Sequence, residues 1–128
     1  GFDDSGYTVE ELKLRDEPRK ILGLPALASH PTCVRVPVMV GHSVSVRAVC
    51  ERPVDLAAFR EALTRAPGVT VPDDYPTPLE AAGSDGVLVG RIRADLEDPN
   101  AVLFWSVADN LRKGAALNAV QIAEVLLA

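Results

Sequence analysis

The sequence has few cysteines, few aromatic side chains and no long apolar run. Two of its 128 residues are cysteine, and 5% are aromatic. Cys33 and Cys50 do not form a CxxC pair, so we expect neither a disulfide framework nor a zinc site, and no other metal site. We interpret both as buried free thiols of a reducing compartment.

Membrane and export signals are missing as well. No apolar run reaches the roughly 20 residues that span a bilayer, and no charged-then-apolar leader opens the chain. We therefore expect a cytoplasmic protein. The first six residues, GFDDSG, are typical of a connecting loop, so we also expect that other residues precede them.

Positive charge is in short supply. Thirteen Lys and Arg residues face 18 Asp and Glu residues, which gives a net charge of −5. Nucleic acid is thereby excluded as a main partner, because phosphate binding needs a cationic face. The 48% hydrophobic content suits one globular domain with a real core.

Three segments have helical patterns. Over 8–23, Thr8 and Glu11 predict a capping box and Gly23 predicts the end, while Pro18 predicts a kink or a break. Residues 53–68 form the clearest amphipathic helix, with Asp55 near its start. Residues 110–128 predict a long final helix with too many apolar side chains for an isolated surface helix, so its partner is expected outside this chain.

Alternating or apolar runs predict five strands, at 32–40, 43–51, 69–71, 87–95 and 101–107. A proline-rich loop, 71–86, separates the third strand from the fourth. The predicted fold class is α+β, with a mixed or antiparallel sheet and helices packed on one face.

The first predicted strand raises a question about two polar residues. Arg35 alternates with valines and so lies on the opposite face, whereas His42, at odd spacing, falls on the valine face. Both can face one ligand only if Gly41 breaks the period, as a bulge or turn would.

These residue types suit a site for an anionic substrate. The planar fork of Arg35 matches a carboxylate, and His42 is the usual general acid or base near neutral pH. Cys33 is a possible nucleophile, although a β-strand lacks the setting that lowers a thiol pKa. Structural alternatives remain open: Arg35 as a solvated residue, His42 as a histidine with satisfied hydrogen bonds, and Glu10 with Lys13 as an exposed ion pair.

Several blocks together resemble the C-terminal part of bacterial aspartate-semialdehyde dehydrogenase. They are EELK, RKILG, TCVRVPVMVGHSVSV, PTPLEAAG, VLVGRIRAD and DNLRKGAALNAVQIAE, in this order over nearly the whole chain. The related N-acetyl-glutamyl-phosphate reductases fit these blocks less well. The resemblance implies a semialdehyde dehydrogenase dimerisation-domain-like fold.

The resemblance also implies a reaction. Members of this family reduce L-aspartyl 4-phosphate to aspartate semialdehyde with NADPH and release phosphate, on the path to lysine, methionine and threonine. A cysteine attacks the acyl phosphate, a thioester forms, and hydride releases the aldehyde. The expected partners are a small-molecule substrate and either a second copy of the chain, as a homodimer, or the N-terminal portion of the same enzyme.

Matching residues take roles from the resemblance. His42 would be the catalytic acid/base, Arg35 would hold the substrate carboxylate, and Glu10 would meet the substrate amino group. Lys13 would lie near the phosphate, and Asn110 would contact NADP. Residues 1–110 would be the C-terminal part of the substrate and dimerisation domain, and residues 111–128 a helix that packs back on the NADP-binding domain.

Two family motifs do not occur in these 128 residues. One is the Asn-Cys-Ser/Thr segment with the nucleophile, and the other is the Gly-rich turn that binds most of NADP. We therefore expect a truncated or separately produced portion that is inactive alone. The alternatives are a non-catalytic dimerisation or interaction module, and one half of a split enzyme whose partner supplies both motifs.

Overall fold

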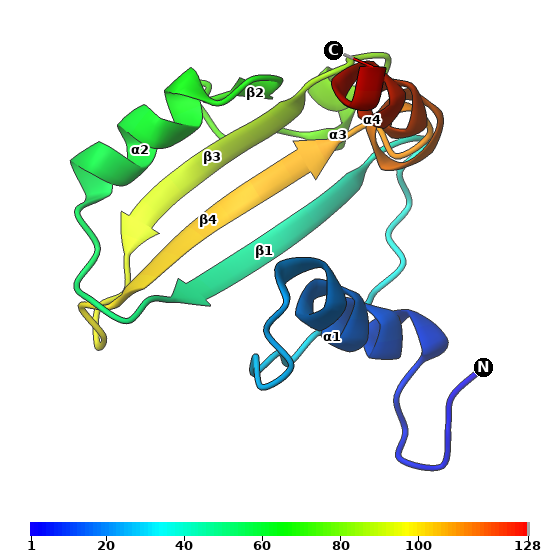
Figure 1. Ribbon diagram of the computed structural model, residues 1–128, viewed down its shortest axis with the longest axis horizontal. Helices are drawn as coiled ribbons and strands as arrows, with labels where there is room; N and C mark the ends of the chain where they lie inside the picture. The colour runs from blue at the N-terminus through cyan, green and yellow to red at the C-terminus, as the bar shows by residue number, and fades with distance from the viewer. Residues whose placement is uncertain (128) are drawn as a thin grey trace. The chain divides into compact units, whose positions relative to one another are not determined.

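The computed structural model describes residues 1–127 and divides the chain into two compact units. The first unit comprises Gly1–Pro37, and the second begins at Val38. Figure 1 labels the elements named below except η1. The first unit contains one helix, α1 (Val9–Leu22). The second contains, in order, β1 (His42–Val49), α2 (Leu56–Arg65), β2 (Val69–Thr70), α3 (Pro78–Ala81), β3 (Val87–Ala94), β4 (Ala101–Ala108), η1 (Arg112–Ala116) and α4 (Leu117–Leu127).

Helix α1 has both predicted ends. The Thr8 hydroxyl accepts a hydrogen bond from the Glu11 amide, the Glu11 carboxylate accepts one from the Thr8 amide, and Gly23 closes the helix at a φ of 67°. Of the kink or break predicted at Pro18, the break does not occur, because α1 is one helix, and the kink stays a prediction. Pro18 has no N–H for the Leu14 carbonyl, and the Ser29 hydroxyl, whose oxygen lies 3.4 Å from that carbonyl oxygen, donates there instead.

The strand predicted at 32–40 does not form. Pro31 stands directly before the predicted strand and Pro37 removes one N–H group within it, and the Cys33 amide donates to the Glu11 carboxylate at 2.8 Å instead of to a strand. The alternating valines have no sheet to cover them, and Val34 is 77% exposed. Alternation here reflects an extended segment rather than a buried strand.

The second unit is built on a four-stranded sheet with the order β1-β4-β3-β2. Strand β4 pairs antiparallel with both β1 and β3, and β2 pairs parallel with β3. Figure 1 shows β1, β4 and β3 as three long neighbouring strands with α2 beside β3 and β2. The α+β class and the mixed sheet are confirmed.

The core of the second unit is small and lies around β4. Its most buried apolar residues are Ala81, Val89, Ala101, Val102 and Val107. Helix α2 begins where predicted, because the Asp55 carboxylate accepts hydrogen bonds from the two amides at 57 and 58. Its Phe59 ring packs 5.7 Å from the Phe104 ring of β4. This contact fixes α2 against the sheet.

Two features inside the predicted strand and loop were missed. Strand β3 carries a bulge, because Gly90 pairs with Trp105 but Arg93 pairs with Leu103, and Arg91 adopts a φ of 54°. The proline-rich loop contains the one-turn helix α3, which the Thr77 side chain caps. A four-residue helix is too short to leave a periodic pattern.

The predicted final helix divides in two. Its first part is a π-helix, η1, and its second part is α4; Ala128, which the prediction included, lies outside the described residues. Apolar side chains on α4 are exposed, namely those of Val120, Ile122, Val125, Leu126 and Leu127. These side chains therefore find no cover within the second unit.

The two cysteines are free thiols, as predicted, but their burial differs from the prediction. Cys33 is half-buried and Cys50 is exposed. Cys50 follows the last residue of β1, where the strand has already left the core. No helix among residues 1–127 is long and apolar enough to cross a membrane.

Candidate functional site

His42 is the first residue of β1, and the structure leaves it exposed. It lies opposite Ala108, the last residue of β4, in the antiparallel register. The end of β4 therefore brings the following turn, Asp109 and Asn110, to the residues that precede β1. The Asn110 side-chain oxygen accepts a hydrogen bond from the Gly41 amide at 2.9 Å.

Gly41 is held in a conformation that needs glycine. Its φ is +103°, and a Cβ atom at this position would lie 3.0 Å from the Cβ of Pro78. The regular strand begins only after this residue, at His42. The strand alternation is thus interrupted at Gly41, which is the condition for Arg35 and His42 to face one ligand. The convergence of Arg35 and His42 remains a prediction, since the two residues belong to different units.

Asp109 anchors the same turn, a role that the sequence alone did not indicate. Its carboxylate is buried and accepts hydrogen bonds from the amides of Gly83, at 2.8 Å, Leu111 and Arg112. These bonds, the Gly83 bond first, lower the pKa of Asp109. The signal in the sequence was the Asp-Asn pair directly after a strand and before a helix, a position typical of capping residues.

In the first unit, Glu10 and Lys13 lie together on the first turns of α1. The Lys13 ammonium nitrogen is 3.5 Å from a Glu10 carboxylate oxygen, and both side chains are more than half exposed. The ion pair that the spacing predicts is therefore present. Arg35 is exposed, and its guanidinium has no ion-pair partner within residues 1–127.

Glu11 connects the segment of Arg35 to α1, a role that sequence reasoning missed. One of its oxygens accepts hydrogen bonds from the Thr8 amide and hydroxyl, and the other accepts one from the Cys33 amide at 2.8 Å. These bonds, the Thr8 amide first, lower the pKa of Glu11. The capping box of Thr8 and Glu11 can be recognised in the sequence. It accounts for the Glu11 oxygen that binds Thr8 but not for the one that binds Cys33.

Cys33 does not have the surroundings of a nucleophile. Burial first, and then the negative charges of Glu11 and Glu10, raise the pKa of its thiol. A raised pKa reduces the thiolate fraction near neutral pH, whereas a reactive cysteine needs more of it. This finding agrees with the expectation from the sequence that Cys33 lacks the setting of a nucleophile.

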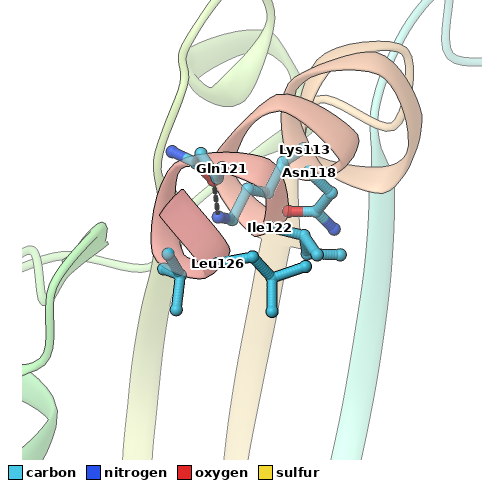
Figure 2. A pocket seen from close by; sticks show the side chains of 6 residues that line it. Lys113, Asn118, Gln121, Ile122 and Leu126 are labelled. Carbon is cyan, nitrogen blue, oxygen red and sulfur yellow. Dashed lines mark hydrogen bonds between the residues drawn. The ribbon is translucent and has the colours of Figure 1, made fainter. Parts of the chain in front are cut away.

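A groove of about 310 Å³ lies on η1 and α4, and none of the five predicted site residues lines it. Figure 2 shows its polar end, where the Lys113 ammonium donates to the Gln121 side-chain oxygen at 2.6 Å. The rest of the lining is mostly apolar, from Ile122, Val125 and Leu126. It is a shallow surface hollow rather than a substrate pocket. Within residues 1–127, no cluster of three or more His, Cys, Asp or Glu side chains could hold a metal ion.

Comparison with known proteins gives consistent relatives. Residues 1–113 match the family described as "Semialdehyde dehydrogenase, dimerisation domain". The chain is 50% identical over 131 residues to an aspartate-semialdehyde dehydrogenase of Legionella pneumophila, and 52% identical over 128 residues to that of Mycolicibacterium smegmatis. Each alignment covers 98% of this chain.

A solved structure agrees with these relatives. The crystal structure of aspartate semialdehyde dehydrogenase II from Vibrio cholerae, complexed with ASA, superposes with a TM-score of 0.94 at 45% identity over 99% of this chain. The chain spans only 39% of that structure, and 38% and 37% of the Legionella and Mycolicibacterium relatives. This chain is thus similar to only a part of each of these proteins.

Proposed function

Because this chain belongs to the semialdehyde dehydrogenase dimerisation-domain family, we propose that it is the C-terminal portion of an NADP-dependent aspartate-semialdehyde dehydrogenase. The full-length protein would reduce L-aspartyl 4-phosphate to aspartate semialdehyde and phosphate, for the synthesis of lysine, methionine and threonine in the cytoplasm. The observation that carries the proposal is identity of about one half to enzymes of that name over 98% of the chain.

His42 would be the acid/base that takes the proton of the nucleophilic thiol. Its exposed position at the start of a sheet strand supports this role, because an imidazole must reach a thiol supplied by another part of the protein. The Asn110 oxygen holds the backbone at Gly41, directly before His42, so the imidazole is presented from a rigid element rather than from a free loop.

Arg35 would bind the substrate carboxylate. The guanidinium has no ion-pair partner within the described residues and is exposed, so it is available to a bidentate anion. The bond from the Cys33 amide to Glu11 supports the position of this segment, because it ties the backbone two residues before Arg35 to α1.

Glu10 and Lys13 would bind the substrate amino group and the phosphate. At present they bind each other at 3.5 Å, and both are more than half exposed. An exposed pair of this kind contributes only about 0.3–0.5 kcal/mol, so a substrate with one ammonium and one phosphate group can replace it at little cost.

The cofactor in its reduced form, NADPH, would supply the hydride, and Asn110 is the one residue of this chain proposed to contact it. The Asn110 oxygen accepts the Gly41 hydrogen bond, which leaves its NH₂ group as a donor for a ligand. Asn110 is only half-buried, so that donor is accessible. An amide donor of this kind suits the carboxamide oxygen of a nicotinamide.

The full-length protein would form a homodimer, and the N-terminal portion would contact this chain. The exposed apolar side chains of α4 support such a contact, because surfaces of this kind mark an interaction site. An interaction module without catalysis would also need this surface. Intact Glu10, Lys13, Arg35 and His42 favour the enzyme.

Kinetics of the full-length protein, this chain joined to its native N-terminal portion, test the proposal. Formation of NADPH from NADP⁺, phosphate and aspartate semialdehyde should exceed by far that with N-acetylglutamate semialdehyde. His42→Asn should reduce kcat by roughly 10²- to 10⁴-fold, the usual contribution of an acid/base. A preference for N-acetylglutamate semialdehyde would contradict the proposed substrate. An unchanged kcat in a folded His42→Asn protein would contradict the acid/base role of His42.

A further inference from the structure

The turn after β4 contains two neighbouring residues whose side chains accept hydrogen bonds from two different segments of the chain. Asp109 accepts from the Gly83 amide, just beyond α3, while the next residue, Asn110, accepts from the Gly41 amide, just before β1. Asp109 also accepts hydrogen bonds from the amides of Leu111 and Arg112, so the turn itself is fixed. Asn110 therefore extends from an anchored backbone.

Gly41 is confined from a second side. A Cβ atom built on Gly41 would lie 3.0 Å from Pro78 Cβ and 3.3 Å from Pro78 Cα, so the first residue of α3 lies directly against this backbone. The φ of +103° is open only to glycine at low cost. A glycine with this freedom needs external contacts to hold one conformation, and Asn110 and Pro78 supply them.

We propose that Asn110 is a positioning residue for His42, acting through the backbone of Gly41. The peptide unit that joins Gly41 to His42 sets the direction in which the imidazole leaves the start of β1. The Asn110 oxygen fixes the preceding amide at 2.9 Å, and the register of His42 with Ala108 fixes the following strand. This inference rests on the proposed acid/base role of His42 and adds to the cofactor contact a task for the other end of the Asn110 side chain.

The two ends of the Asn110 amide can be separated by substitution. Only the side-chain oxygen of Asn110 can accept a hydrogen bond from a backbone N–H. The NH₂ group therefore has no part in holding Gly41. Asn110→Asp keeps an acceptor oxygen and loses the NH₂ group, whereas Asn110→Ala loses both. A cofactor contact through NH₂ is therefore lost in both variants, and positioning through the oxygen is lost only in alanine.

Steady-state kinetics of the full-length protein test the proposal. Both variants lose the NH₂ group, so the positioning effect is the difference between them: kcat of Asn110→Ala should lie roughly 10- to 100-fold below that of Asn110→Asp, as a small misplacement of a catalytic group implies. Both variants should raise the KM for NADP⁺ if the NH₂ group contacts the cofactor. Equal kcat for wild type and a folded Asn110→Ala, or equal losses of kcat in both variants, would overturn the positioning role.

A double-mutant cycle separates this proposal from the acid/base assignment. If the Asn110 oxygen acts through His42, the difference in kcat between Asn110→Ala and Asn110→Asp should shrink to less than about threefold when each is combined with His42→Asn. A difference as large as that between the two single variants would overturn the coupling. If His42→Asn itself leaves kcat unchanged, the acid/base assignment has failed, whatever Asn110 does.

Exchange of the Gly41 amide with solvent provides a readout independent of turnover, which serves if Asn110→Ala is poorly active for other reasons. In nuclear magnetic resonance spectra, this amide should exchange slowly in the wild type and in Asn110→Asp. It should exchange at least tenfold faster in Asn110→Ala, while the amide of Gly83, held by Asp109, stays protected. Equal protection of Gly41 in all three proteins would contradict the inference.

Discussion

The ring of Pro76 lies directly over Gly90 of β3, so closely that a Cβ atom on Gly90 would be 2.4 Å from Pro76 Cδ. The carbonyl of the same proline accepts a hydrogen bond from the Trp105 indole at 3.1 Å, and Trp105 is the register partner of Gly90. The proline-rich loop is therefore attached to the sheet at the one strand position without a side chain.

This contact predicts a loss of stability for Gly90→Ala. The added methyl group must displace a buried proline ring, and overpacking of this kind costs about 1–3 kcal/mol in the free energy of unfolding. Urea titration of both proteins would measure it. Gly114→Ala is the matched control, because its Cβ would lie 3.7 Å from the nearest atom, an ordinary contact. Equal stability of the two variants would contradict the assigned contact.

Glu11 predicts a specific dependence of stability on pH. Hydrogen bonds from Thr8 and Cys33 lower its pKa in the folded state, so ionised Glu11 contributes stability above the unfolded pKa, and this contribution disappears as the pH falls through the lowered folded pKa. Glu11→Gln should therefore be less stable than wild type near neutral pH, and the difference should shrink in acid.

Urea unfolding between about pH 7 and about pH 3 checks this, with Glu17→Gln as the control. Glu17 is on the same helix, is exposed and has no ion pair within residues 1–127. Glu17→Gln should follow the wild-type curve. A stability of Glu11→Gln that also followed the wild-type curve would disprove the stabilising role of the hydrogen bonds to Glu11.

Arg35→Lys should impair the full-length enzyme although the charge is kept. The bidentate fork is lost, so the KM for aspartate semialdehyde should rise, or kcat fall, by roughly 10-fold or more. Arg60→Lys on the exposed side of α2 should leave both constants unchanged. Unchanged kinetics for both variants would mean that Arg35 does not bind the carboxylate.

The apolar surface of α4 predicts association of the 128-residue chain. Sedimentation equilibrium should give the mass of two copies, or of a complex when the N-terminal portion is added, because the exposed side chains on this helix favour contact over water. Val125→Glu should weaken association if the helix takes part. A chain that stays monomeric at high concentration, alone and in the mixture, would exclude this surface as an interface.

Elements with local signals were predicted well from the sequence. Thr8 with Glu11, and Asp55 before its helix, identify helix starts because capping depends on neighbours within three residues. The strands of the sheet were found because apolar runs bounded by turn residues are typical of strands. The extended segment around Val34 has the same alternation, but two prolines and the bond to Glu11 keep it out of the sheet.

The candidate site could be predicted only in part. Residue types at His42 and Arg35 suggested acid/base chemistry and anion binding, and the family resemblance implied the roles that are proposed for them. The hydrogen bonds that the Gly41 amide donates to Asn110 and the Cys33 amide donates to Glu11 join residues 69 and 22 positions apart, and no local pattern contains such pairs. The bulge at Arg91 likewise depends on its partner strand.

The central claim is that this chain contributes catalytic residues to an aspartate-semialdehyde dehydrogenase but cannot complete the reaction alone. The most direct measurement compares NADPH formation from aspartate semialdehyde, phosphate and NADP⁺ by the isolated chain and by the full-length protein. We expect turnover by the full-length protein, loss of it in the His42→Asn variant, and none by the isolated chain. Turnover by the isolated chain that is lost on Cys33→Ser, or its absence from the folded full-length protein, would contradict the claim.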